Sequence, residues 1–253
     1  MGFYTPDPYC FDRFLIHKNS PKVRTGMLPS SSTRLTALIV GASGLVGSHL
    51  LDYLLTDRQF GEVKALVRRP LSISHPKLRT ILFDFELPDA SVIQADAIFC
   101  CLGTTIRQAG SKAAFRKVDF DYPLQIARFG RANGATAFHL VSSMGADAHA
   151  PFFYSQVKGE LEEALQHLGY PALYIYRPSL LLGKRPEQRI GEKIGEVVLR
   201  LAEPLLRGGL RKYRAIEAGS VAKAMCYHAQ TNKTGVFRYE SDQLSTDAQH
   251  YNP

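Results

Sequence analysis

Short apolar runs alternate along most of the chain with longer segments in which apolar residues recur every three or four positions. The first pattern predicts buried strands, and the second predicts helices that bury one face. Continuous apolar strands separated by helices indicate a parallel sheet that is covered on both faces. Right-handed crossovers then give a doubly wound, Rossmann-type α/β fold. We expect strands at residues 35–40, 62–67, 79–85, 96–102, 137–141 and 172–177, and helices at residues 48–57, 113–132 and 154–168.

The two ends of the chain depart from this alternation. Residues 1–33 contain four prolines and a run of three serines without sustained periodicity, which predicts a flexible N-terminal extension. Met27 as the true start and a docking arm for a partner are the alternatives there. Residues 34–253 are expected to form a single domain, in which residues 178–253 supply the elements of a small carboxyl-terminal substrate lobe. Within that lobe, apolar spacing predicts one helix around residues 194–201 and another at residues 221–228.

Composition and charge exclude several classes of protein. Hydrophobic residues make up 45% and charged residues 21% of the chain, which is ordinary for a globular protein. No apolar run approaches the roughly 20 residues that a membrane-spanning helix needs. The formal net charge is +8, but the cations are dispersed and no zinc-finger, RNP or basic-zipper pattern occurs, so nucleic acid is not the expected partner.

The four cysteines are Cys10, Cys100, Cys101 and Cys226, and none of them forms a CxxC pair. They predict reduced, buried thiols, with no disulfide framework and no metal site. On this ground we expect a cytoplasmic protein.

A glycine-rich turn joins the first predicted strand to the first predicted helix. Gly41, Gly44 and Gly47 form a GxxGxxG loop, in which the first allows a tight turn, the second close approach and the third close helix–strand contact. Backbone amides at a helix N-terminus bind phosphate when no Cβ obstructs them. The loop therefore predicts a dinucleotide site.

Two further strand ends refine the expected cofactor. The second strand ends in Arg68 and Arg69, where NAD-selective proteins usually place an acidic residue, and two guanidiniums suit a 2′-phosphate. The sequence therefore favours NADPH. Leu102 and Gly103 end the fourth strand, where the middle of the cofactor crosses the sheet. An ordinary charged turn and an ordinary Gly-Thr turn are the respective alternatives.

The candidate chemistry lies at Tyr154 and Lys158, which are one helical turn apart and share a face. An ammonium near a phenol favours the phenolate, so Tyr154 can exchange a proton with a carbonyl or alcohol oxygen. Ser143, or its neighbour Ser142, follows the fifth strand and is expected to steady the substrate oxygen. A helical tyrosine beside a solvated lysine is the alternative interpretation of such a pair.

The segments GASGLVG, CCLGTT, LVSSMGA, YSQVKGE and YRPSLLLG together resemble the short-chain dehydrogenase/reductase superfamily. More narrowly, they are similar to the atypical subgroup that includes the Tat-interacting oxidoreductase-like proteins. The resemblance covers roughly residues 35–228 and implies an NADPH-binding Rossmann domain with a small substrate lobe. It also implies a set of cofactor contacts: Gly41, Ser43, Gly44, Leu45, Val46, Gly47, Arg68, Arg69, Leu102, Gly103, Tyr154, Lys158, Leu181 and Arg189.

The chain departs from the superfamily in one respect. Many members use an Asn on the fourth helix to support a proton relay through water, and this chain has Asp119 near that place. The subgroup is also associated with regulatory partner binding. Two functions therefore stay open, an oxidoreductase acting on a small carbonyl or alcohol and an NADPH-sensing protein that binds a regulatory partner. An epimerase acting on a nucleotide sugar ranks lower, because it needs a larger lobe, and the oligomeric state stays open.

Overall fold

The computed structural model describes residues 34–183, 208–231 and 233–253. In these ranges seven strands form one parallel sheet in the order β3-β2-β1-β4-β5-β6-β9. The strand order reverses between β1 and β4, as in a doubly wound Rossmann fold, which confirms the predicted fold class. The strands are Leu35–Val40 (β1), Phe60–Val67 (β2), Leu78–Leu82 (β3), Ala97–Cys100 (β4), Ala137–Val141 (β5), Ala172–Arg177 (β6) and Gly235–Glu240 (β9).

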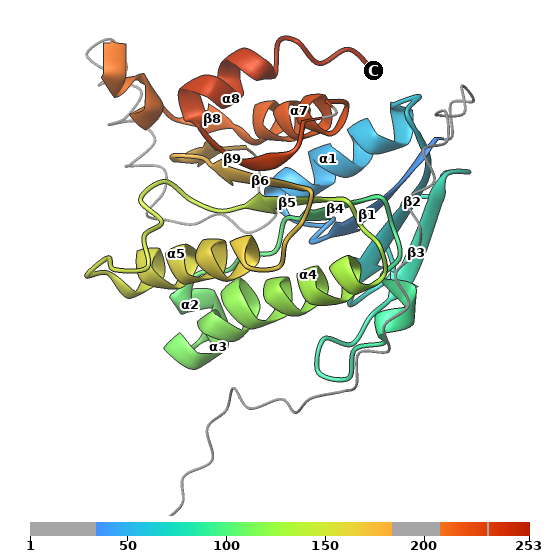
Figure 1. Ribbon diagram of the computed structural model, residues 1–253, viewed down its shortest axis with the longest axis horizontal. Coiled ribbons are helices and arrows are strands. Elements are labelled where there is room, and N and C mark those ends of the chain that lie inside the picture. Colours follow the sequence, from blue (N-terminus) through green and yellow to red (C-terminus); the bar gives the residue numbers. More distant parts are fainter. Residues whose placement is uncertain (1–33, 184–207, 232) are drawn as a thin grey trace, which may run out of the picture. The chain divides into compact units, whose positions relative to one another are not determined.

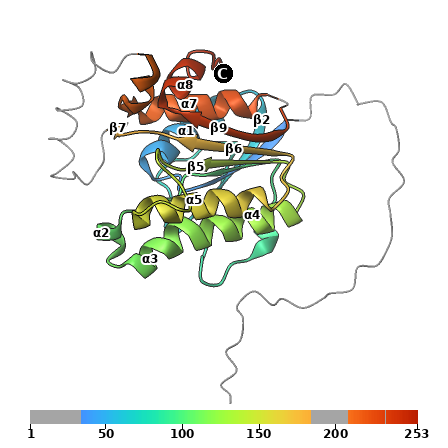
Figure 2. The same ribbon diagram turned by 60° about the vertical axis from the view of Figure 1, so that its left-hand side comes forward.

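Helices cover both faces of this sheet, as Figures 1 and 2 show. Helices α1 (Leu45–Thr56) and α7 (Ala218–Ala229) lie on one face, and α4 (Tyr122–Ala132) and α5 (Phe153–Gln166) lie on the other. Each face carries its own cluster of buried apolar side chains, because strands that are covered on both sides need apolar residues at every position. None of the helices in these ranges has both the length and the apolar character needed to cross a bilayer.

Shorter elements complete the domain. They are the helices α2 (Ile106–Ala109), α3 (Lys112–Arg116) and α8 (Ser241–Asp247), and short 3₁₀ helices at Ala90–Val92 and Gly208–Tyr213. Strands β7 (Leu181–Leu182) and β8 (Ile216–Glu217) form a separate two-stranded sheet.

The predicted helix at residues 113–132 contains a wide turn. Helix α3 runs into a π-helical turn at Lys117–Asp121, and α4 follows it directly. A π turn holds more residues than an α turn and rotates the residues that follow. Asp119, four residues after the buried Phe115, lies inside this turn and is buried, with 1% of its surface exposed, whereas the apolar Val118 is only half-buried.

The last part of the chain contributes to the main sheet as well. Strand β9 pairs with β6 in parallel, and α7 packs against α1. Sequence analysis did not predict β9. The expected helix around residues 194–201 and the expected N-terminal extension both lie outside the described residues, and the substrate lobe stays a prediction.

Candidate cofactor and catalytic site

The glycine loop between β1 and α1 is a tight turn that leaves no room for a side chain at Gly41 or Gly47. Gly41 has φ +84°, and a Cβ there would lie 2.6 Å from the carbonyl oxygen of Cys101. A Cβ on Gly47 would lie 2.1 Å from the Gly41 carbonyl oxygen. Gly44 is the N-cap residue of α1 and has no side chain to cap the helix, and the first turn of the helix contains no acidic residue. This cradle of backbone amides fits a pyrophosphate.

The other candidate residues of the loop differ in exposure. Ser43 is exposed, Leu45 is half-buried, and the Val46 side chain belongs to the core. A cofactor could therefore reach Val46 only through its main chain. The segment after β7 also reaches this loop, because a Cβ on Gly183 would lie 2.7 Å from Cδ1 of Leu45.

Four of the cofactor contacts that the sequence predicts outside the glycine loop are Leu181, Arg189, Arg68 and Arg69. Leu181 lies in β7, two residues before the glycine that touches the loop, and it is half-buried. Arg189 lies outside the described residues. Arg68 and Arg69 are both exposed directly after β2, the strand next to β1.

The ends of β1 and β4 bring the glycine loop to the candidate catalytic lysine. The Cys101 amide donates to the Val40 carbonyl at 2.8 Å, which aligns the two strand ends. Leu102 is half-buried and Gly103 is exposed just beyond. A Cβ on Gly103 would lie 3.9 Å from the Lys158 ammonium nitrogen. The structure thus brings together predicted residues that are far apart in the sequence.

The Lys158 side chain lies on the buried face of α5 and pairs with a carboxylate. Its Nζ lies 2.8 Å from Oδ1 of Asp119, and the two side chains are 4% and 0% exposed. The other oxygen of Asp119 accepts the Thr104 amide at 2.9 Å. Burial lowers the pKa of the Lys158 ammonium, but the charge of Asp119 and the proximity of Tyr154 outweigh burial, and the pKa is raised. Lys158 therefore stays charged inside the protein.

Tyr154 stands one turn earlier on α5, at the surface. It is 37% exposed, and its ring packs against Phe115 with a centroid separation of 5.5 Å. The phenol is therefore open to solvent, whereas the ammonium one turn later on the same helix is buried. Phe152, just before α5, is 74% exposed.

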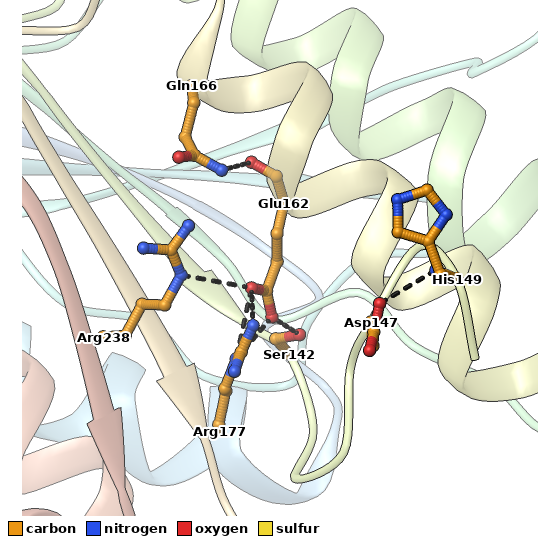
Figure 3. A network of polar contacts seen from close by, with 7 residues as sticks. All are labelled: Ser142, Asp147, His149, Glu162, Gln166, Arg177 and Arg238. Atoms are coloured by element: carbon orange, nitrogen blue, oxygen red, sulfur yellow. Dashed lines mark hydrogen bonds and ion pairs between the residues drawn. The ribbon is translucent and has the colours of Figure 1, made fainter.

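The two serines after β5 have different surroundings, and Figure 3 shows those of Ser142. Ser142 is buried, and its hydroxyl donates to Oε1 of Glu162 at 2.6 Å. The Ser143 Oγ is buried and has no hydrogen-bond partner in the described ranges. A buried hydroxyl without a partner is uncommon in folded proteins and suits an oxygen that arrives with a ligand.

Glu162 is the centre of the polar network in Figure 3. Arg177, at the end of β6, donates to both of its oxygens at 2.5–3.1 Å, and Nε of Arg238 on β9 lies 3.6 Å away. The hydrogen bond to Glu162 raises the pKa of Arg177. The network ties α5 to the strand end that carries Ser142 and Ser143.

The sequence did not identify Glu162 or Arg177 as part of the site. For Asp119 it predicted no contact with Lys158. The spacing along α5 was one available signal for Glu162. Glu162 follows Lys158 by four residues and therefore lies on the same face of the helix as Tyr154 and Lys158. Its arginine partner lies on another element and has no local signal.

A cavity of about 230 Å³ lies at the amino-terminal ends of the central strands, opposite the strand ends that carry the candidate site. Ala97, Ala137 and Ala172, the first residues of β4, β5 and β6, line it. Since the glycine loop, Gly103 and Ser143 all follow strand ends, this cavity is separate from the candidate site. In the described ranges no three His, Cys, Asp or Glu side chains are grouped as metal ligands. Cys100 and Cys226 are buried free thiols, and Cys101, just beyond β4, is half-buried.

Comparison with known proteins gives consistent results. The sequence model of a family described as NAD(P)H-binding matches residues 41–176. Protein HTATIP2 of Rattus norvegicus is 40% identical over 163 residues, which are 62% of this chain and 67% of that protein. The mitochondrial protein FMP52 of Candida albicans is 32% identical over 209 residues, which are 79% and 90% of the two chains.

Solved structures with a similar fold include nucleotide-sugar enzymes. A UDP-N-acetylglucosamine 4-epimerase from Methanobrevibacter ruminantium has a TM-score of 0.60 at 16% identity, covering 82% of this chain and 76% of that one. The Bordetella bronchiseptica enzyme WbmG, in complex with NAD, has a TM-score of 0.59 at 15% identity, covering 84% and 74%. At these identities the likeness concerns the fold alone.

The expectation of a cytoplasmic protein is wrong. The relatives named FMP52 from Candida albicans, Coccidioides immitis and Eremothecium gossypii, and FMP52-1 from Scheffersomyces stipitis, are all described as mitochondrial. The expectation rested on cysteine usage, and reduced thiols do not distinguish one compartment inside the cell from another.

The glycine loop, the matched family model and the relatives that align over most of their length lead to one conclusion: the chain belongs to the family described as NAD(P)H-binding.

Proposed function

We propose that this protein is an NADPH-dependent oxidoreductase that transfers hydride to or from a small carbonyl or alcohol substrate, with Tyr154 as the acid/base. The observation that carries the proposal is the Lys158 ammonium beside Gly103, with Tyr154 one helical turn away, next to a backbone cradle suited to a dinucleotide. The mitochondrial relatives also favour a mitochondrial location for this chain.

The residues of the chain divide the work as follows. The main chain of Ser43, Gly44, Leu45 and Val46 would hold the pyrophosphate, and Arg68 and Arg69 would bind the 2′-phosphate. Bound NADPH would supply the reducing equivalents.

At the reacting end, the unpartnered hydroxyl of Ser143 would donate to the substrate oxygen and hold it near the phenol. Tyr154 would donate its proton to that oxygen, or accept one in the opposite direction. Lys158 would favour the charge that forms on the phenol.

Cofactor choice gives the first test. We expect fluorescence titration to show that NADPH binds more tightly than NADH, because two guanidiniums can pair with the extra phosphate. Arg68→Ala with Arg69→Ala should weaken NADPH binding at least about tenfold, since charge-assisted hydrogen bonds contribute roughly 1.5–3 kcal/mol each. NADH binding should change little.

Arg58→Ala with Arg128→Ala is the matched control, because both side chains are exposed and the pair of changes removes the same two charges elsewhere. Equal affinities for the two cofactors, or an equal loss in the control, would contradict the assignment of the arginines. If NADPH binds tightly but no carbonyl or alcohol is turned over, the NADPH-sensing function becomes the better proposal.

The two serines give the second test. Ser143→Ala should lower turnover about 10²-fold or more, as removal of one preorganised donor to a developing oxyanion does, with little loss of stability. Ser142→Ala should instead leave Glu162 with one donor fewer and lower the free energy of unfolding by roughly 1–3 kcal/mol. Thermal melts and steady-state kinetics on both variants separate the two roles. If Ser142→Ala gives the larger loss of turnover in a stably folded protein, the roles are reversed.

A further inference from the structure

The buried carboxylate of Asp119 has both oxygens engaged within the catalytic centre. Oδ1 lies 2.8 Å from the Lys158 ammonium, and Oδ2 accepts the Thr104 amide at 2.9 Å. The Asp119 side chain is fully buried, so water does not screen its charge. Lys158 and Asp119 therefore form a pair that is neutral as a whole beneath Tyr154.

The other titratable groups around this pair do not provide such compensation. Cys100, on β4, is fully buried, and burial raises its pKa to about 11, so the thiol is neutral at physiological pH. Arg116, on α3, pairs with Glu160 on α5 at 2.5 Å. Glu162, one turn beyond Lys158, is matched by Arg177.

The remaining charged groups on this side are exposed to water. Lys112 lies over the Phe153 ring at 5.2 Å, at the start of α5. Asp147 belongs to the loop that packs against Gly159 of α5 and is exposed as well. Exposed charges contribute little across a protein surface in salt. Among the described residues, Asp119 is thus the charge that determines how strongly Lys158 acts on its neighbour.

We propose that Asp119 offsets the charge of Lys158 so that Tyr154 keeps its proton near neutral pH and is ready to give it to a carbonyl oxygen. The proposal rests on the proposed function, since it concerns the proton donor of that same reaction.

The sign follows from the charges. A lone ammonium favours the phenolate, and a carboxylate bound to that ammonium opposes the effect. Reduction requires a phenol that can give its proton to the carbonyl oxygen, whereas oxidation of an alcohol requires a phenolate that can accept one. In reduction the O–H bond of Tyr154 breaks as one forms on the product alcohol, and NADPH provides the electron pair. Tyr154 is 37% exposed and can recover a proton from water.

The ionisation of Tyr154 can be measured without any substrate. Phenolate absorbance is recorded against pH for the wild type and for Tyr154→Phe, and their difference isolates Tyr154 from the other eleven of the 12 tyrosines. The same difference is recorded in an Asp119→Asn background. We expect the midpoint for Tyr154 to fall by about one pH unit or more when Asp119 is neutralised. An unchanged or higher midpoint overturns the proposal.

Asp121→Asn is the matched control, because Asp121 belongs to the same π turn, carries the same charge and is exposed. It should leave the midpoint unchanged, and a shift equal to that of Asp119→Asn would overturn the proposal.

A second set of variants keeps the test decisive if Asp119→Asn folds poorly with an unpaired lysine inside. Asp119→Asn combined with Lys158→Met removes both charges and should return the Tyr154 midpoint to within about half a unit of the wild type. A midpoint displaced by a full unit in that double variant overturns the proposal.

Turnover supplies a separate readout. If no carbonyl is reduced by any variant while the midpoint of Tyr154 still falls in Asp119→Asn, the proposed function fails and the role of Asp119 stands. If carbonyls are reduced but the midpoints coincide, the proposed function stands and the role of Asp119 is overturned.

Discussion

Replacing Tyr154 with Phe is expected to lower turnover of a carbonyl substrate by about 10²–10⁴-fold, the usual contribution of a positioned general acid. The change removes one hydroxyl and keeps the ring that packs against Phe115. Because the side chain is 37% exposed, the free energy of unfolding should stay within about 0.5 kcal/mol of the wild type. Steady-state kinetics, NADPH titration and a thermal melt on the same preparation provide the measurement.

Tyr213→Phe is the matched control for this prediction. Tyr213 is 45% exposed and the Lys212 ammonium lies 5.5 Å from its ring centroid, so it also combines a surface phenol with a lysine. Its loss should leave turnover unchanged. A Tyr154→Phe variant that reduces its substrate at the wild-type rate would show that another group supplies the proton, and the assignment of the acid/base would be wrong.

The central strands could be predicted from the sequence, and the edge strand β9 could not. β1, β5 and β6 have the predicted bounds because they are largely buried from both sides and consist mostly of apolar residues. β9 lies at the edge of the sheet, and all of its residues are exposed or half-buried. Its residues therefore alternate apolar and charged types without a clear run, and only pairing with β6 identifies it as a strand.

The candidate site divides in the same way between local and long-range features. The GxxGxxG loop and the Tyr154–Lys158 spacing depend on a few consecutive residues, so the sequence alone predicts them. The burial of Asp119 has no local signal, because a buried carboxylate needs a partner and its partner, Lys158, lies on another helix. The surroundings of Ser142 and Ser143 differ because Glu162 accepts a hydrogen bond from Ser142, and that contact cannot be read from the sequence.

The ion pair between Glu162 and Arg177 is where we expect the largest loss of stability from one substitution. Glu162 is 1% exposed, and Arg177 supplies two donors to its carboxylate. Arg177→Met would leave a buried charge with only Ser142 and the more distant Arg238, so the free energy of unfolding should fall by about 3–5 kcal/mol. For a domain of this size the melting temperature should fall by roughly 6–20 °C.

Two further variants decide whether this loss comes from the unpaired carboxylate. Arg238→Met removes the same charge from a side chain that is 39% exposed and 3.6 Å from Glu162, and it should cost no more than about 1 kcal/mol. Combining Arg177→Met with Glu162→Met removes both buried charges and should restore most of the stability, because apolar replacements of a buried pair are often neutral. If the double variant is as unstable as Arg177→Met alone, the loss reflects packing at the end of β6. If it recovers its stability but turns over poorly, Glu162 holds the serine loop in place for Tyr154.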